Sequence, residues 1–367
     1  MSTAVRIAPA ATAAHALIVS NRTTITSLAL RDFGPWWPAT ATDVLRPAAH
    51  PTVDARVDAS HRAALTRMII DYAYEDILYA GERTLVRQET NGDVYAAQPA
   101  QRLAYHSVPA RRWLAVSGQE REPVALAAVR LARDLVRAQL LRAGWVLLHA
   151  SAVARDGRAL LAVGPTGAGK STVALTLARQ DGWDLLANDR VFARLAKDGA
   201  VQLLPWPAAA AFGFGLLDGL GLYDTVRSLY LTGEQLHPTQ HPQVTHALTV
   251  GDRTPQWNGN RRTELTCQFF PDQVVSWLGC TLATHATAAA VLHPRISAEL
   301  AVPEAGEGAE LGARDAFSAA TDDRYPDPGP VRERLAALPG QSVVLGHHAE
   351  ANTDALTRLA DTLLSAG

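Results

Sequence analysis

The strongest chemical pattern in the chain lies near its middle, where residues 164–171 read GPTGAGKS and Thr172 follows. These eight residues satisfy the pattern G-x-x-x-x-G-K-[ST] at each fixed position. In this pattern the backbone N–H groups of a glycine-rich turn, and of the helix after it, surround the phosphates of a nucleotide. The residues expected to bind a nucleotide are Gly164, Pro165, Thr166, Gly167, Ala168, Gly169, Lys170, Ser171 and Thr172.

Two side chains of this P-loop motif have further roles. Lys170 is expected to reach the β and γ phosphates, and the Ser171 hydroxyl to bind Mg²⁺. Lys170 also stands out by composition, because Lys197 is the one other lysine among 34 basic residues. The motif therefore predicts ATP or GTP, together with Mg²⁺, as cofactors.

An acidic residue, Asp189, ends the next apolar segment, LLAND. Nucleotide-binding proteins with this loop place an aspartate after a strand, where it serves Mg²⁺ directly or through water, or acts on the attacking hydroxyl. An aspartate in this position can also be a helix cap. Beside the P-loop motif we expect Asp189 to be a catalytic and metal-binding residue, with Arg190 either pairing with it or touching phosphate.

The elements around these residues alternate in type. An apolar strand, ALLAV, precedes the motif, a helix with the sequence STVALTLARQ follows it, and another strand leads to Asp189. Strands that alternate with a helix at this spacing predict an α/β fold with some parallel pairing.

The segment from Leu147 to Val191, 45 residues, resembles the HPr kinase/phosphorylase-like P-loop proteins, whose core is similar to that of phosphoenolpyruvate carboxykinases. His149 lies 21 residues before Lys170, and an N-D-R-V element closes the segment. A looser similarity joins DGLGLYD, residues 218–224, to the family's RGLG segment. The resemblance implies a P-loop kinase domain of the HPr kinase C-terminal type, a mixed sheet with flanking helices. It also implies that His149 lies beside the reacting phosphate and is catalytic, as are Lys170 and Asp189; the alternative for His149 is a structural role.

Three departures from the family pattern argue against a true HPr kinase. Thr172 stands in place of a glutamate, Asn188 in place of the first of two aspartates, and Leu216 in place of another glutamate. An amide cannot take a proton from a hydroxyl, so Asp189 or Asp218 is left as the candidate base. We expect a divergent kinase that phosphorylates a hydroxyl of a peptide, protein or small molecule. The alternative is a nucleotide-binding regulatory or scaffold protein that has lost phosphoryl transfer.

A positively charged side chain from elsewhere in the chain is expected to stabilise the charge on the transferred phosphate. Arg261 and Arg262, in NGNRRTEL, are the candidate catalytic arginines, and their alternative is a solvated surface pair. The remaining histidines show no metal-ligand spacing, so no zinc is predicted.

Composition limits the partners and the compartment. The formal charge is 34 minus 36, or −2, which predicts no nucleic-acid partner. No stretch approaches the roughly 18 apolar residues that a membrane span needs, and the segment after Arg6 lacks the apolar centre of a signal peptide. Two cysteines are too few for a disulfide framework, which favours a cytoplasmic protein. The resemblance adds a homo-oligomer as an expectation.

The length of 367 residues predicts two domains, with one enlarged α/β domain as the alternative. The main boundary is expected near residues 120–144, which gives a β-rich α+β domain over 1–122 and the kinase-like domain over 123–367. Apolar periodicity predicts helices over 60–74 and 123–143. Trp36 and Trp37 are expected to be core aromatics, with an exposed binding patch as the alternative.

Overall fold

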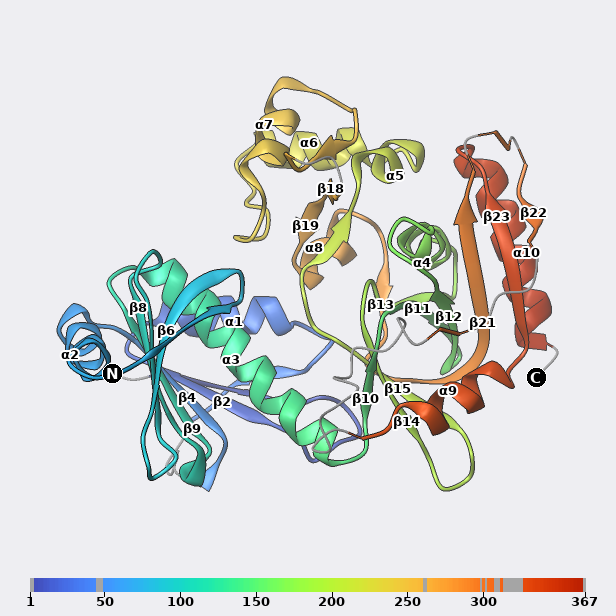
Figure 1. Cartoon of the computed structure of the whole chain (residues 1–367). Coiled ribbons are helices and arrows are strands. Elements are labelled where there is room, and N and C mark those ends of the chain that lie inside the picture. Colours follow the sequence, from blue (N-terminus) through green and yellow to red (C-terminus); the bar gives the residue numbers. More distant parts are fainter. Residues whose placement is uncertain are drawn as a thin grey trace. The chain divides into compact units, whose positions relative to one another are not determined.

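The protein is mixed α/β, with two large mixed sheets and flanking helices (Figure 1). The computed structural model describes residues 3–43, 49–259, 263–297, 299–300, 302–306, 311–312 and 326–365. The chain divides into two compact units, Met1–Gln139 and Leu140–Gly367. The expected domains meet at 122/123, within a boundary region of about 120–144, and the two units divide inside that region, within α3 (Arg121–Arg142), the helix expected over 123–143.

The N-terminal unit is built on a nine-stranded sheet in the order β3-β1-β2-β4-β9-β8-β7-β6-β5. Neighbouring strands are antiparallel except that β2, β4 and β9 run parallel. The strands are β1 (Thr3–Ile7), β2 (Ala16–Ser20), β3 (Ala39–Ala41), β4 (Thr52–Val57), β5 (Glu75–Tyr79), β6 (Glu82–Gln88), β7 (Val94–Gln98), β8 (Leu103–Val108) and β9 (Trp113–Gly118), with the short 3₁₀ turn η2 (Pro109–Arg111) before β9.

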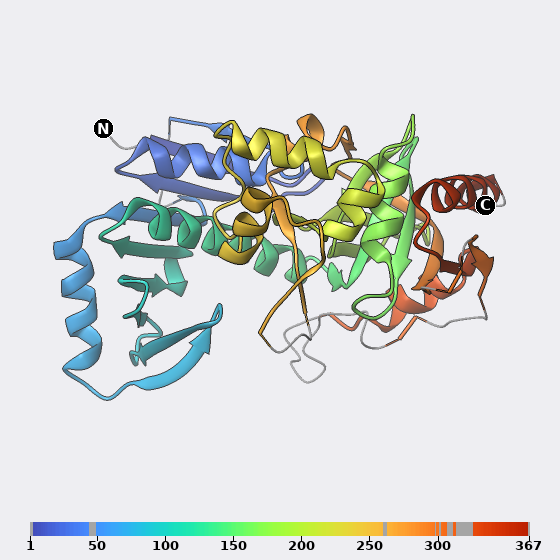
Figure 2. The same ribbon diagram turned by 90° about the horizontal axis from the view of Figure 1, so that it is seen from above.

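Two further helices cover parts of this sheet. Helix α1 (Thr23–Phe33) packs on β1, β2 and β3, and α2 (Ala59–Ile70) packs on β7, β8 and β9. The helix expected over 60–74 ends at Ile70, because Tyr72 and Tyr74 beyond it are exposed and the chain turns toward β5. Figure 2 shows α2 leading along one side of the unit into β5.

Trp36 and Trp37 lie in the core of this unit. Their side chains are 1% and 0% exposed, and the ring of Trp37 stacks on Phe33 with centroids 6.0 Å apart. The expectation of core aromatics is confirmed, and the alternative of an exposed binding patch is wrong.

The C-terminal unit is built on a ten-stranded sheet whose main order is β10-β14-β15-β21-β12-β11-β13-β20. Strand β23 pairs in parallel with β21, and β22 pairs with β23. The strands are β10 (Val146–Leu148), β11 (Ala150–Arg155), β12 (Arg158–Val163), β13 (Asp184–Ala187), β14 (Val191–Leu195), β15 (Val201–Pro205), β20 (Thr281–Leu282), β21 (Ala286–Ile296), β22 (Glu304–Ala305) and β23 (Gly340–Leu345).

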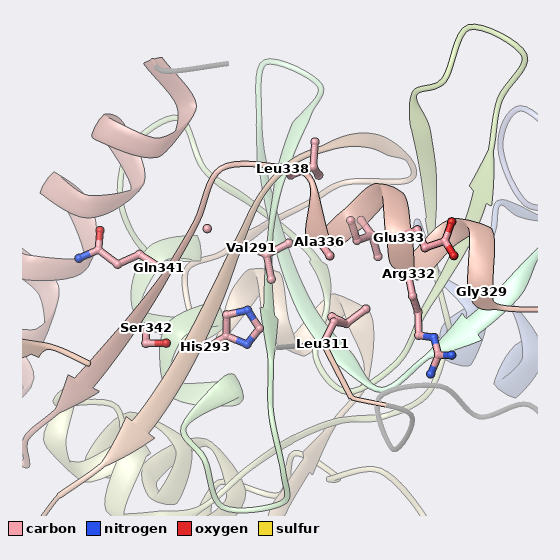
Figure 3. A pocket seen from close by; sticks show the side chains of 12 residues that line it. Val291, His293, Leu311, Gly329, Arg332, Glu333, Ala336, Leu338, Gln341 and Ser342 are labelled. Carbon is pink, nitrogen blue, oxygen red and sulfur yellow. The ribbon is translucent and has the colours of Figure 1, made fainter. Parts of the chain in front are cut away.

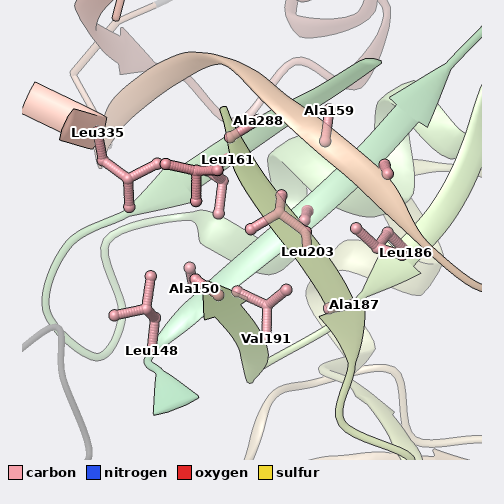
Figure 4. Close-up of a cluster of buried hydrophobic side chains, with 14 of the residues drawn as sticks. Leu148, Ala150, Ala159, Leu161, Leu186, Ala187, Val191, Leu203, Ala288 and Leu335 are labelled. Carbon is pink, nitrogen blue, oxygen red and sulfur yellow. The ribbon is translucent and has the colours of Figure 1, made fainter. Parts of the chain in front are cut away.

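Helices α4 (Lys170–Ala178), α9 (Gly329–Ala336) and α10 (Ala349–Ser365) pack against this sheet. Strand β12 is buried along nearly its whole length, which accounts for its continuous apolar run. Small side chains dominate the core cluster around it, so the strands pack closely against α9 (Figure 4).

A group of short elements lies between β15 and β20 in sequence (yellow and orange in Figure 1). Its helices are α5 (Phe214–Gly219), α6 (Tyr223–Leu231), α7 (Pro242–Val250) and α8 (Pro271–Ser276). Its two small sheets pair β16 (Ala210–Phe212) with β19 (Cys267–Phe269), and β17 (Gln256–Trp257) with β18 (Glu264–Leu265).

Within the part of the chain that the structure describes, no helix is both long and apolar enough to cross a bilayer.

Candidate functional site

The glycine-rich loop, residues 164–169, joins the end of β12 to the start of α4. Gly164, Gly167 and Gly169 all have positive φ, a region that other residues rarely adopt. Gly169 has a second constraint, because a Cβ there would lie 2.9 Å from Cδ1 of Ile296 at the end of β21. The loop is thus fixed between the sheet and the first turn of α4.

Lys170 begins α4 and turns its side chain back into the loop. Its Nζ donates to the carbonyl oxygens of Gly164, at 2.8 Å, and Pro165, at 3.0 Å, and the residue is 7% exposed. Pro165, Thr166 and Gly167 are exposed, so the outer edge of the loop faces solvent. The loop therefore holds a buried ammonium at a helix N-terminus, two sources of positive potential in one place.

Asn188 connects this loop to two other strands. Its Oδ1 accepts from the Ala211 backbone N–H at 2.8 Å, which orients the amide so that Nδ2 donates to Ser171 Oγ at 3.3 Å. The Ser151 hydroxyl on β11 donates to the Asn188 backbone carbonyl. Asn188 is 9% exposed, and it fixes the Ser171 hydroxyl relative to β16. From the sequence, Asn188 was expected to be a lost base, and its positioning role was not expected.

Asp189, directly after Asn188, lies between two cationic or potentially cationic side chains. His149 Nε2 is 3.3 Å from Asp189 Oδ1, and Arg190 Nε is 3.1 Å from Asp189 Oδ2. His149 occupies the junction between β10 and β11, while Asp189 follows β13. The structure thus brings together His149 and Asp189, which are 40 residues apart in sequence (189 minus 149).

The charges around Asp189 change its ionisation. Burial raises the pKa of this carboxyl, but the hydrogen bond from His149 and the charges of Arg190, His149 and Lys170 outweigh burial and lower the pKa below its usual value. Its side chain is still 55% exposed. Asp189 is therefore an ionised carboxylate that faces solvent, and the positive charge of Lys170 helps to keep it ionised.

Two other residues singled out from the sequence, Leu216 and Asp218, lie on α5. Asp218 and Asp224 both accept from Arg253, so Asp218 is held in an arginine bridge on α5 and α6. Arg261 and Arg262 lie outside the described residues.

One carboxylate near this region was missed by sequence reasoning. Glu264, on β18, lies against Gly213, because a Cβ on that glycine would be 2.2 Å from Glu264 Oε1. Burial raises the pKa of Glu264. Gly213 is two residues beyond Ala211, which Asn188 contacts. In the sequence, the one signal for Glu264 was its position two residues after Arg262 in NGNRRTEL.

The oxygen donors at the site suit a Mg²⁺ ion that also binds phosphate. Mg²⁺ in nucleotide sites takes one or two protein oxygens, with the remainder from phosphates and waters. Ser171 Oγ and the Asp189 carboxylate are oxygens of the kind that Mg²⁺ takes, and Ser171 keeps a second lone pair beside the one that accepts from Asn188. Among the described residues, no group of three or more His, Cys, Asp or Glu side chains is placed to hold a metal.

A cavity of about 630 Å³ lies away from these residues, between α9, β21 and β23 (Figure 3). Its lining includes His293, Arg332, Glu333 and Ser342, and none of the residues expected to bind nucleotide. The cavity and the glycine-rich loop are separate features of the C-terminal unit.

Comparison with known proteins adds no assignment. A scan against protein-family models and a search of curated proteins each found no match to this chain.

Proposed function

We propose that this chain is a nucleotide-dependent, Mg²⁺-requiring kinase of the P-loop type, with a domain similar to the HPr kinase C-terminal domain. One observation carries the proposal: Asp189, after β13, is ionised between His149 and Arg190 and is influenced by the charge of Lys170, the buried first residue of α4. Ser171 follows Lys170, and its hydroxyl contacts Asn188, the neighbour of Asp189. These are the groups that phosphoryl transfer needs for positioning and for charge stabilisation.

The glycine-rich loop supplies the binding energy for the nucleotide. Phosphate oxygens replace the Gly164 and Pro165 carbonyls as acceptors for Lys170 Nζ, and the N–H groups of the first turn of α4 donate to the same phosphates. Bound Mg²⁺ would neutralise phosphate charge, and it would be held by Ser171 Oγ and, through water, by Asp189, whose carboxylate then remains able to accept a proton. Asn188 keeps Ser171 Oγ in place for this contact.

Asp189 is the proposed base. Its lowered pKa keeps it ionised at neutral pH, so it accepts a hydrogen bond from the incoming hydroxyl. The hydroxyl oxygen bonds to the γ phosphorus, the bond from that phosphorus to the bridging oxygen breaks, and the nucleoside diphosphate leaves with the electron pair. The hydroxyl proton passes to Asp189, and His149 orients that carboxylate through its 3.3 Å contact.

The acceptor is proposed to be a hydroxyl of a peptide, protein or small molecule. The net charge of −2 gives no field for a nucleic-acid acceptor. Both cysteines are buried and unpaired, which suits a reducing compartment, and we place the activity in the cytoplasm.

The test is transfer of label from γ-labelled ATP or GTP, with Mg²⁺, to components of a cell extract. The native protein is compared with Lys170→Ala, and Lys197→Ala is the matched control because Lys197 lies outside the loop. A labelled acceptor that is lost only with Lys170→Ala supports the kinase. Nucleotide hydrolysis with no labelled acceptor in any sample would contradict it.

A nucleotide-binding regulatory protein is the second candidate, and Asn188 is the observation that favours it. Its amide contacts Ser171 and Ala211, and it cannot act as a base. Asn188→Asp separates the two candidates. Restored or increased phosphorylation indicates a weakened catalyst, whereas intact nucleotide binding with no transfer in either form favours the regulatory protein.

A further inference from the structure

The N-terminal unit concentrates exposed apolar side chains in one short segment. Thirteen large apolar side chains are exposed among the described residues, and six of them fall within residues 68–78. These six are Met68, Ile70, Tyr72, Tyr74, Ile77 and Leu78. Leu78 is the most exposed of the thirteen, at 75%. The segment covers the end of α2 and most of β5, so an apolar surface adjoins a strand.

Strand β5 is an edge strand. It ends the nine-stranded order, and among the described residues it pairs only with β6. Natural proteins usually protect such edges with charged side chains, especially lysine, with proline or with a bulge. β5 has the sequence EDILY, which contains no lysine or proline and keeps a uniform register with β6. Its two charged side chains, Glu75 and Asp76, stand at its first two positions. This edge can therefore accept another strand.

The turn after β5 determines which backbone groups face outward. Ala80 and Gly81 both have positive φ, the geometry of a two-residue type I′ turn. Tyr79 and Glu82, which flank such a turn, form the hydrogen-bonded pair of the hairpin. By alternation Glu75, Ile77 and Tyr79 bond to β6, while the N–H and C=O groups of Asp76 and Leu78 point to the open edge.

We propose that β5 pairs with β5 of a second copy of this chain, antiparallel, with Ile77 on the two-fold axis. In this register Asp76 of each copy exchanges backbone hydrogen bonds with Leu78 of the other, so every outward group of the two strands is used. The two sheets become one continuous sheet, and the interface is self-complementary, as a two-fold dimer requires.

The charges on the strand select this register. With Ile77 on the axis, Glu75 lies opposite Tyr79 and Asp76 opposite Leu78, so no carboxylate faces another. A register centred on Asp76 would place two carboxylates directly opposite each other. One centred on Leu78 would place Asp76 against Ala80, where the backbone has left the strand.

Asp76 is also neutralised within its own copy. Arg83 Nε donates to Asp76 Oδ2 at 2.7 Å, and Arg83 NH2 lies 2.6 Å from the same oxygen. An approaching second strand therefore meets a paired carboxylate, and the apolar Ile77 and Leu78 supply the surface to be buried. This interface rests on the N-terminal unit alone and does not depend on the proposed kinase function.

The decisive test uses Ile77→Cys in the full chain. Residues on the axis form a non-hydrogen-bonded pair with Cα atoms about 4.5 Å apart, within the range that a disulfide spans. Under mild oxidation this variant should form a covalent dimer of twice 39.2 kDa. Cys267 and Cys280 are buried and do not compete. The matched control is Trp257→Cys, 44% exposed where Ile77 is 43% exposed, which should stay monomeric.

Sedimentation of the uncrosslinked proteins provides the second measurement. The native chain should sediment as a reversible dimer, and Ile77→Lys, which sets two ammonium groups opposite each other, should raise the dimer dissociation constant by about tenfold. Circular dichroism verifies that the variant is folded. A native monomer, or cross-linking of Ile77→Cys no faster than of Trp257→Cys, overturns the proposal. A native monomer or slow cross-linking is the result expected if the β5 edge binds a different partner, such as an extended peptide, and not a second copy of the chain.

Discussion

Asp32 in the N-terminal unit and Asp189 in the C-terminal unit each face an arginine, but in different surroundings. Asp32, on α1, is 3% exposed and lies 2.8 Å from Arg133 of α3. Asp189, after β13, is 55% exposed and lies between Arg190 and His149. The first pair joins two helices in the interior, whereas the second stands at the end of a strand beside the glycine-rich loop.

The difference in burial indicates that Asp32 has a structural role, whereas Asp189 can bind a ligand. A buried carboxylate needs a permanent partner, because an uncompensated charge in the interior is costly. A half-exposed carboxylate can exchange a side-chain partner for a metal, a water or a substrate hydroxyl with little loss.

The largest effect is expected from Lys170→Ala. The change removes the ammonium that the loop encloses, and with it the charge that stabilises the transferring phosphate. Transfer to the acceptor should fall by about 10³-fold, as for loss of one strong electrostatic donor. The measurement is the initial rate of label transfer. A rate within a few-fold of the native rate would show that the loop lysine does not act on phosphate.

Asp189→Asn comes next. The amide keeps the shape of the side chain but loses the charge and the ability to accept a proton, so kcat should fall by about 10²-fold. Nucleotide affinity, measured separately by calorimetry, should change less than kcat. Equal losses in both would assign Asp189 to binding and not to the transfer step.

The ionisation of Asp189 can be followed without activity. Its pKa is lowered, so its contacts with His149 and Arg190 stabilise the fold above the usual carboxyl range and are lost as the pH falls through the lowered pKa. The free energies of unfolding of the native protein and Asp189→Asn should therefore converge in acid. A difference that stays constant with pH would contradict the ion-pair assignment.

Asn188→Ala should have a smaller and different effect. It removes the donor to Ser171 Oγ and the acceptor for Ala211 N–H, so the hydroxyl is no longer held in place. We expect KM for Mg²⁺-nucleotide to rise about tenfold with kcat little changed, the effect of about one hydrogen bond. Asn188→Asp keeps the acceptor for Ala211 and is the matched variant. A fall in kcat with unchanged KM would indicate a role in the chemical step.

Asp32→Asn should have the smallest effect on transfer and a large effect on folding. It leaves Arg133 without its buried carboxylate, which should lower the free energy of unfolding by about 3 kcal/mol. The rate per folded molecule should stay at the native value, because the pair lies in the N-terminal unit. Chemical denaturation and label transfer on the same preparation measure both. An unchanged free energy of unfolding would mean that this pair is not structural.

The sequence was informative where local pattern determines structure. The glycines at 164, 167 and 169 predicted a tight loop, and all three have positive φ. The apolar run before them predicted a buried strand, and β12 is buried on both faces. The core position of Trp36 and Trp37 was also predictable from their proline-bounded aromatic cluster.

Contacts between distant residues were not predictable in the same way. The hydrogen bond between Asn188 and Ala211 and the ion pair between Arg253 and Asp218 each join residues more than 20 positions apart in sequence. No spacing rule predicts contacts of this kind. The apolar residues from Met68 to Tyr72 fitted a helical pattern, and only the strand order, which ends at β5, shows that Ile77 and Leu78 lie on a sheet edge.

Equilibrium titration with Mg²⁺ and ATP, and with Mg²⁺ and GTP, tests the central claim most directly, since the proposed activity begins with phosphate binding at residues 164–171. The native protein and Asp32→Asn should bind one of the two nucleotides with the same affinity, and Lys170→Ala should bind it at least about tenfold more weakly. Equal binding by Lys170→Ala, or binding of neither nucleotide by the native protein, would contradict the account.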